Sequence, residues 1–381
     1  MAREKTPLMV RIKRSELAIG QRVPWNIYDS RHRILVERGR ILKSEEEFRT
    51  VGLSGDIYRD VSSGSSLEHQ NSGPLQSSIF DDIDHLETRM RNALRSLYEN
   101  PEELPDRILK LAELLYRYVK DDADAAIGIA HLYHDGNYTE LHPIHVAILT
   151  LVLTMAKSYD KERSVLVAAA ALSKHISVAK FQEELHEQTT PLTEAQRQAI
   201  QTYPQKSYEL LQKLGVKDSV WLNAVLQCQE NEDGSGYPLG ITGEQITEGA
   251  KIVAIADRYS AMTSDRNYRK GNLSNSVLKR FFEGKGSSIN EELTLFFIKE
   301  LGVYPPGTYV KLSDGYTGIV IRRGIHASKP SVSCYRDDLG HLMAKPVIRN
   351  LFRDPSKITA TIPPQDIGNL SLKWIWGQLI V

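Results

Sequence analysis

The sequence contains only two cysteines, Cys228 and Cys334, in 381 residues. Two isolated cysteines provide neither a disulfide framework nor the ligand spacing of a zinc site, and this usage suits a reducing compartment. No charge sign is in excess, because 48 basic residues balance 48 acidic residues. A balanced charge argues against a protein built mainly around nucleic acid or an anionic membrane, although it leaves room for a local basic patch, and we expect no nucleic-acid partner and no membrane span.

Long apolar runs are also missing. The longest, VAILTLVLTMA at 146–156, is too short to span a bilayer and predicts a buried helix. The N-terminal stretch MAREKTPLMVRIKR has no apolar core of the kind found in secretory signals. Because 41% of the residues are apolar and 25% are charged, we predict a globular cytoplasmic protein with two or three domains.

The pattern along the chain predicts two segments before the main domain. Residues 1–60 mix short alternating stretches with turns and predict a small N-terminal module of β or α/β structure. Residues 61–78 are rich in Ser and Gly and predict a flexible linker.

The rest of the chain changes period once. Residues 79–303 repeat apolar residues every three or four positions and predict a helical domain that extends from about Ile79 to Leu301. Residues 304–349 contain strand, Asp-Gly turn and strand patterns and predict a small antiparallel β module. Residues 350–381 form a C-terminal tail, and its apolar end is expected to pack back on the body. The predicted fold class is mainly α, a helical bundle flanked by two small β-containing modules.

A glycine-rich loop, DGSGYPLG at 233–240, is the most distinctive short motif. Gly234, Gly236 and Gly240 permit backbone angles closed to other residues, and Pro238 stiffens the loop. Tyr237 stands between Gly and Pro, so we expect its ring to point outward or against a neighbouring surface. A glycine loop by itself is usually only a turn.

Charged residues follow the loop. Asp257 lies in an otherwise apolar helical stretch, IVAIADRYSAM, where an acid has to be paired or liganded. Arg266, Arg269 and Lys270 cluster shortly afterwards, and arginine forks match phosphate oxygens. Taken singly, a lone buried acid is more often a hydrogen-bond partner than a metal ligand, and a cluster of Arg and Lys is usually a solvated face.

In order, the segments DGSGYP, AKIVAIAD and SAMTSDRNYR resemble the HD-GYP family of bacterial signalling proteins. The resemblance covers about residues 100–305 and is strongest over 228–270. It implies an all-helical bundle of the HD phosphohydrolase superfamily, whose active members hydrolyse cyclic di-GMP with two or three metal ions, commonly iron or manganese. It also implies phosphate contacts for Arg266 and Arg269, and we expect Lys270 beside them to bind the ligand as well.

The family's metal ligands are only partly kept. The resemblance places ligands at His142 and Asp257, with His175 as a possible third ligand one position out of register. Four other ligand positions carry replacements: Lys174, Tyr203, Cys228 and Gln229. One imidazole and one carboxylate would hold manganese or iron weakly. We therefore expect no catalytic residue and no metal cofactor.

Lys174 sharpens this expectation. An ammonium held about 4 Å from a dication is repelled by roughly 8 kcal/mol at an effective dielectric near 20. The family brings the positions of Lys174 and Asp257 to one metal, so the hypothesis is that the ammonium now pairs with Asp257. The alternative is that Lys174 extends to solvent.

The sequence leaves three functions open. The favoured one is a catalytically degenerate protein that acts as a sensor, receptor or scaffold in cyclic di-GMP signalling, with Gly236, Tyr237 and Pro238 contacting a partner such as a GGDEF-type diguanylate cyclase. The second is a metal-dependent phosphodiesterase with weak residual activity through His142, His175 and Asp257. The third is an interaction module that binds no nucleotide.

Overall fold

The computed structural model describes residues 9–12, 27–28, 34–36, 40, 57–60, 78–134, 136–188, 190–264, 273–283, 290–364 and 371–377. The chain divides into two compact units, residues 1–74 and 75–381. The predicted linker falls almost entirely outside the described residues, and so does the cluster of Arg266, Arg269 and Lys270.

The N-terminal unit contains a four-stranded antiparallel sheet with the order β1-β4-β2-β3. Its strands are β1 (Met9–Ile12), β2 (Ile27–Tyr28), β3 (Ile34–Val36) and β4 (Ile57–Asp60). The β structure predicted for this module is therefore present in the described residues.

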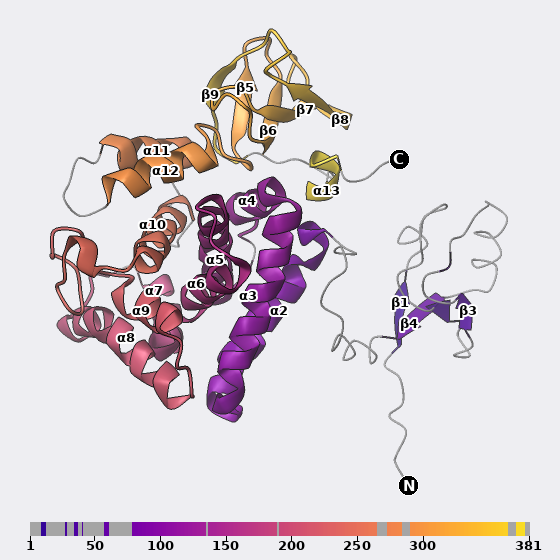
Figure 1. Ribbon diagram of the computed structural model, residues 1–381. Helices are drawn as coiled ribbons and strands as arrows, with labels where there is room; N and C mark the ends of the chain where they lie inside the picture. The colour runs from indigo at the N-terminus through magenta and orange to yellow at the C-terminus, as the bar shows by residue number, and fades with distance from the viewer. Residues whose placement is uncertain are drawn as a thin grey trace. The chain divides into compact units, whose positions relative to one another are not determined.

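The second unit is mainly helical (Figure 1), which confirms the predicted fold class. Its helices are α2 (Ile79–Glu99), η3 (Pro101–Glu103), α3 (Leu104–Asp121), α4 (Ala123–Leu132), α5 (Tyr138–Ala156), α6 (Lys161–Ser173), η4 (Ile176–Val178), α7 (Ala179–Glu187), α8 (Glu194–Lys213), α9 (Ser219–Gln227), η5 (Gly243–Gln245), α10 (Glu248–Thr263), α11 (Ser274–Glu283) and α12 (Glu291–Leu301). The helical pattern predicted from Ile79 to Leu301 begins and ends at these residues.

Helix α5 forms the centre of this bundle, with α6, α10, α4, α3 and α2 packed around it. Sixteen of its residues are buried, including the polar side chains Glu140, His142 and His145. A helix buried on nearly all sides accepts polar groups only where they find partners. The buried histidines of α5 therefore indicate that the interior of the bundle contains polar partners as well as apolar side chains.

Two helical stretches in the described part of the chain are long and apolar enough to cross a membrane by length and composition. They are Tyr138–Ala156, with 89% of its apolar window buried, and Lys161–Gln182, with 67% buried. The first is longer than the predicted apolar run because the helix begins with YTELHPIH, whose polar side chains face the interior of the bundle. Core helices pass the same test, so it is weak evidence for a span.

A five-stranded antiparallel sheet follows the bundle, with the order β8-β7-β6-β5-β9. Its strands are β5 (Tyr309–Leu312), β6 (Thr317–Arg322), β7 (Ser331–Arg336), β8 (Leu342–Asn350) and β9 (Ile358–Thr361). The sheet extends beyond position 349, because β9 returns along the edge of β5. Arg322, the last residue of β6, and Arg323, which follows it, pair with Asp122 and Asp124 at the start of α4 and attach the sheet to the bundle.

The C-terminal tail does pack back on the helices, through α13 (Leu372–Ile375). Ile375 and Trp376 are buried, and the ring of Trp376 lies 4.9 Å from the ring of Phe80 in α2. The Trp376 ring also covers Gly128 of α4 so closely that a Cβ atom there would lie 2.4 Å from it.

Candidate functional site

His142 reaches the interior of the bundle because of how α5 begins. Asn137 caps the helix by accepting a hydrogen bond from Thr139 N at 2.8 Å. The backbone N–H of Asn137 in turn donates to Glu87 of α2 at 3.0 Å, and Glu140 pairs with Arg91 of the same helix. These contacts fix the first turn of α5. His142 lies in the next turn of the helix, inside the bundle, with 3% of its surface exposed.

Asp257 of α10 receives three donors. Lys174 Nζ and His142 Nε2 each lie 2.8 Å from its Oδ1 atom, and Gln229 Nε2 donates to Oδ2 at 3.2 Å. Lys174, the C-cap residue of α6, has no exposed side-chain surface. We call the set of Lys174, His142, Asp257 and Gln229 the ion-pair centre. Lys174 pairs with Asp257, and the alternative that it extends to solvent is wrong.

The electrostatics of the centre follow from these contacts. Burial by itself would raise the pKa of Asp257, but the charge of Lys174 and the hydrogen bond from His142 hold this pKa well below its usual range. Because a carboxylate only accepts, His142 donates through Nε2, and its Nδ1 faces Ser260 Oγ at 3.3 Å. Ser260 was not predicted, although its position one turn after Asp257 on the same helix face points to the centre.

His175 lies beside the centre rather than on the carboxylate. Lys174 Nζ is 3.1 Å from its Nδ1 and 3.0 Å from its Nε2. Because one ring carbon separates the two nitrogens, nearly equal distances place the ammonium between them instead of on a single lone pair. His175 therefore contributes a polarisable ring beside the ammonium.

Aromatic rings continue from the centre towards the glycine loop. Tyr138 stacks on His142 with ring centroids 4.8 Å apart, and His175 lies 4.8 Å from Tyr203. Tyr203 in turn meets the edge of Tyr237 at 6.5 Å. Tyr203 is buried in α8, and burial raises the pKa of its hydroxyl well above the usual range.

Cys228, the C-cap residue of α9, is 1% exposed and donates to the Val225 carbonyl at 3.2 Å. Burial raises the pKa of its thiol to about 12, so the thiol is protonated at neutral pH. A buried thiol of this kind behaves as a small core residue.

Residues 233–240, which we call the GYP loop, lie over the end of α9. Gly234 and Gly240 have φ values of 77° and 64°, as the sequence predicts. Gly236 has a different role, because a Cβ atom there would lie 2.4 Å from Glu230 Cα and Asn231 N. Tyr237 and Pro238 are half-buried, and the Tyr237 hydroxyl points inward to Gln229 Oε1 at 3.4 Å.

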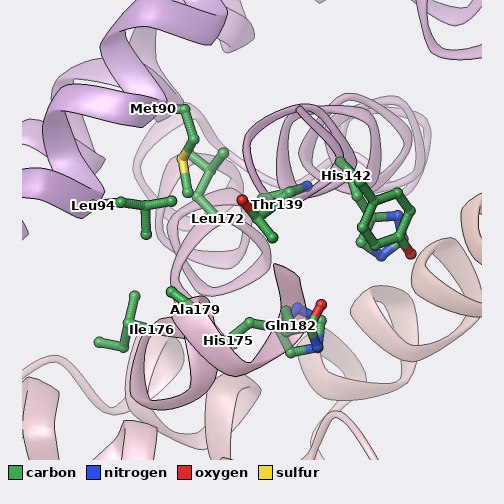
Figure 2. Close-up of a pocket in the computed structure, with 11 residues that line it drawn as sticks. Met90, Leu94, Thr139, His142, Leu172, His175, Ile176, Ala179 and Gln182 are labelled. Carbon is green, nitrogen blue, oxygen red and sulfur yellow. The ribbon is translucent and has the colours of Figure 1, made fainter. Parts of the chain in front are cut away.

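A narrow pocket with a cavity volume of about 10 Å³ adjoins the centre. Figure 2 shows His142 on one side of it and His175 with Gln182 on another, with Met90 and Leu94 of α2 forming an apolar wall. The structure thus brings together His142, His175 and Asp257 from three helical segments, as the resemblance implies.

Comparison with known proteins agrees with this geometry. Residues 113–288 match the family model described as HD domain. The chain is 27% identical over 202 residues to the cyclic di-GMP phosphodiesterase PA4108 of Pseudomonas aeruginosa, covering 52% of this chain and 48% of that protein. It is 26% identical over 196 residues to the cyclic di-GMP phosphodiesterase PdeB of Borreliella burgdorferi, covering 51% of each. The chain spans about half the length of these curated relatives.

A solved structure, described as Bd1817, an HDG"Y"P protein from Bdellovibrio bacteriovorus, covers 76% of this chain and 98% of its own at 15% identity, with a TM-score of 0.49. Residues 113–288, which carry the buried His and Asp side chains, match an HD domain. Together with the cyclic di-GMP phosphodiesterases among the relatives, this match supports the HD-GYP family.

The comparisons correct one prediction. We expected no metal cofactor, but the relatives are HD-domain phosphodiesterases, a metal-dependent class, so that expectation is wrong for the class to which the chain belongs. The side chains in place fit such an ion poorly. Within the described ranges, no group of three or more His, Cys, Asp or Glu side chains is arranged to hold a metal, and the Lys174 ammonium lies against Asp257. We therefore derive no chemical step through a metal.

Proposed function

We propose that this chain is a cyclic dinucleotide receptor or scaffold of bacterial cyclic di-GMP signalling, which binds its ligand without hydrolysing it and works in the cytoplasm. Its relatives are named as phosphodiesterases of cyclic di-GMP and, for one protein of Vibrio cholerae, of 3'3'-cGAMP. The observation that carries the proposal is the contact between the buried ammonium of Lys174 and Asp257 at 2.8 Å.

The contact matters because hydrolysis needs an activated water and a positive charge that faces the transferring phosphoryl group. Lys174 has no exposed side-chain surface and its charge is directed to Asp257. The described centre therefore has an internally neutralised pair where the family has its reacting groups. Such a pair preserves the fold of the site without supplying a nucleophile.

Phosphate recognition is proposed for Arg266, Arg269 and Lys270, on the strength of the sequence alone. Two phosphates on a compact, doubly anionic ligand suit forked guanidinium groups. Arg266→Ala should weaken binding by about 1.5–3 kcal/mol, the range for a hydrogen bond to a charged group. Binding should also weaken as salt rises.

One preparation tests the proposal. Titration calorimetry with cyclic di-GMP measures binding, and chromatography of the same mixture after incubation with manganese or ferrous iron measures hydrolysis. We expect binding without linear product. Turnover that Asp257→Ala abolishes would refute the receptor role, and so would the absence of binding to the wild-type protein.

The second candidate is a metal-dependent cyclic di-GMP phosphodiesterase. It is favoured by the names of the relatives and by the convergence of His142, His175 and Asp257 at one place. The metal content of the purified protein, measured beside turnover, distinguishes it from the receptor. Lys174→Asp is the decisive variant, because it restores a carboxylate at a ligand position and should raise metal content and turnover together if the centre retains the family chemistry.

Contact with a GGDEF-type diguanylate cyclase through Gly236, Tyr237 and Pro238 is also part of the proposal. A tyrosine offers a large, stiff contact surface at low entropic cost. Tyr237→Ala should weaken binding to a purified cyclase by about 2 kcal/mol or more, whereas Ser235→Ala, an exposed change in the same loop, should have little effect. A Tyr237→Ala protein that melts much earlier, or that retains the cyclase, would contradict a role as anchor.

A further inference from the structure

Four consecutive residues after α9 hold the GYP loop against α10. Three of them bond to α10: Gln229 to Asp257, Asn231 to Arg258, and Glu232 to Lys251. The fourth, Glu230, accepts a hydrogen bond from Leu239 N at 2.6 Å, at the far end of the loop. Only the contact of Gln229 reaches the ion-pair centre.

The orientation of the Gln229 amide is determined by its neighbours. Asp257 Oδ2 only accepts hydrogen bonds, so the group facing it at 3.2 Å is the amide nitrogen of Gln229. The amide oxygen therefore faces the other way, where the Tyr237 hydroxyl donates to it at 3.4 Å. One side chain thus connects the buried carboxylate to the tyrosine of the loop.

The backbone adds a second connection at the same residue. Tyr237 N donates to the Gln229 carbonyl oxygen at 3.2 Å. Gly236 lies so close that a Cβ atom would be 2.6 Å from this oxygen. A displacement of Gln229 is therefore passed to residues 236 and 237 by direct contact.

We propose that Gln229 is a relay that couples the charge balance of the ion-pair centre to the conformation of the GYP loop. A phosphate that takes a hydrogen bond from Lys174 or His142 changes the donors on Asp257, and the amide of Gln229 then shifts from the position in which it reaches both Asp257 and Tyr237. The amide oxygen and the Gln229 backbone move with it, which loosens the hold on Tyr237. The physiological trigger rests on the proposed nucleotide binding, whereas the coupling itself belongs to the free protein.

A ligand-free mutant cycle tests the coupling. Hydrogen–deuterium exchange at the Tyr237 amide is compared in wild type, Asp257→Asn, Gln229→Met and the double variant. Asp257→Asn should accelerate this exchange about three- to tenfold, the effect of about one hydrogen bond. In the Gln229→Met background the same change should have no further effect, because the relay is already broken. If Gln229 only fills space, Asp257→Asn should accelerate exchange at Tyr237 by the same factor in the Gln229→Met background, because the two effects at Tyr237 would then be independent.

Glu232→Gln is the matched control, because Glu232 also holds this segment to α10, through Lys251 at 2.8 Å, but does not touch the centre. The effect of Asp257→Asn should persist in that background. If Asp257→Asn does not fold, the double variant Lys174→Met with Asp257→Asn takes the place of Asp257→Asn in the cycle, because it removes both charges of the pair. Equal effects of the centre variant with and without Gln229, or none at all, would overturn the relay. Calorimetry of the wild type with cyclic di-GMP tests the proposed function separately, and the relay is decided by the mutant cycle whether or not the nucleotide binds.

Discussion

Removal of the Lys174 ammonium is the most direct test of the buried pair. In Lys174→Met, Asp257 keeps His142 and Gln229 but loses its cation, in a site with almost no exposed surface. Breaking a buried ion pair on one side costs about 3–5 kcal/mol, mainly because the remaining charge is left uncompensated. At about 2–4 °C per kcal/mol for a domain of this size, the melting temperature should fall by roughly 6–20 °C.

The controls separate burial from charge. The pair of Lys251 and Glu232 has the same 2.8 Å distance, but its side chains are 17% and 20% exposed. Lys251→Met should therefore cost about 1 kcal/mol or less, as for partly solvated pairs. The double variant Lys174→Met with Asp257→Asn removes both charges and should recover most of the loss, because no buried charge is left unpaired.

Circular dichroism melts and urea unfolding of these variants give the answer. A Lys174→Met protein that melts within about 2 °C of wild type would refute the reasoning, since one kcal/mol alone produces a shift of that size. Failure of the double variant to recover would show that packing, and not charge, holds Lys174 in place.

Further predictions concern acid stability, the loop and the tail. The pKa of Asp257 lies below its ordinary value of 3.8, so the ionised carboxylate should stabilise the protein by a constant amount above about pH 5. This contribution should be lost as the pH falls below 3.8 and through the lowered pKa. The urea midpoints of wild type and Asp257→Asn should therefore converge in acid. Burial lowers the pKa of His131 from 6.5 to about 4, so between these values only the unfolded state takes up its proton; stability should fall by about 2–3 kcal/mol as pH falls through this window, and His131→Phe should flatten that slope. Gly236→Ala should lower the free energy of unfolding by about 1–3 kcal/mol, because the new Cβ atom would lie 2.4 Å from the backbone atoms Glu230 Cα and Asn231 N. An unchanged midpoint of chemical unfolding would contradict this geometry. Gly128→Ala should displace Trp376 and shift its fluorescence to longer wavelength, and an unchanged spectrum would show that α13 adapts.

The sequence determined the helical period, the change to strands after Tyr304 and the order of the family motifs. These are local properties, since apolar spacing and turn residues act within a few positions of the chain. The start of α2 at Ile79 and the end of α12 at Leu301 follow from such signals, including the Ser78 cap with Asp81. The same signals predicted that His142 and Asp257 lie in helices and that residues 233–240 form a loop.

The tertiary structure decided what those residues do together. The distance between Lys174 and Asp257 depends on how α6 and α10 pack, and no local pattern specifies whether a lysine turns inward or snorkels. The sequence left these two alternatives open, and the packing selected the buried pair. The inward direction of Tyr237 was likewise open, because Gly236 and Pro238 allow a ring on either side of the loop.

Gln229 shows the same division between sequence and structure. From the sequence it is only a replaced ligand position, whereas in the folded chain it joins Asp257 to Tyr237 across three segments. Side-chain contacts between residues 28 and 8 positions apart arise from packing and not from spacing along one helix. The sequence by itself therefore determined the family and the fold class. The tertiary structure decided that an ammonium is paired with the buried Asp257, because only packing brings the ends of α6 and α9 to the middle of α10.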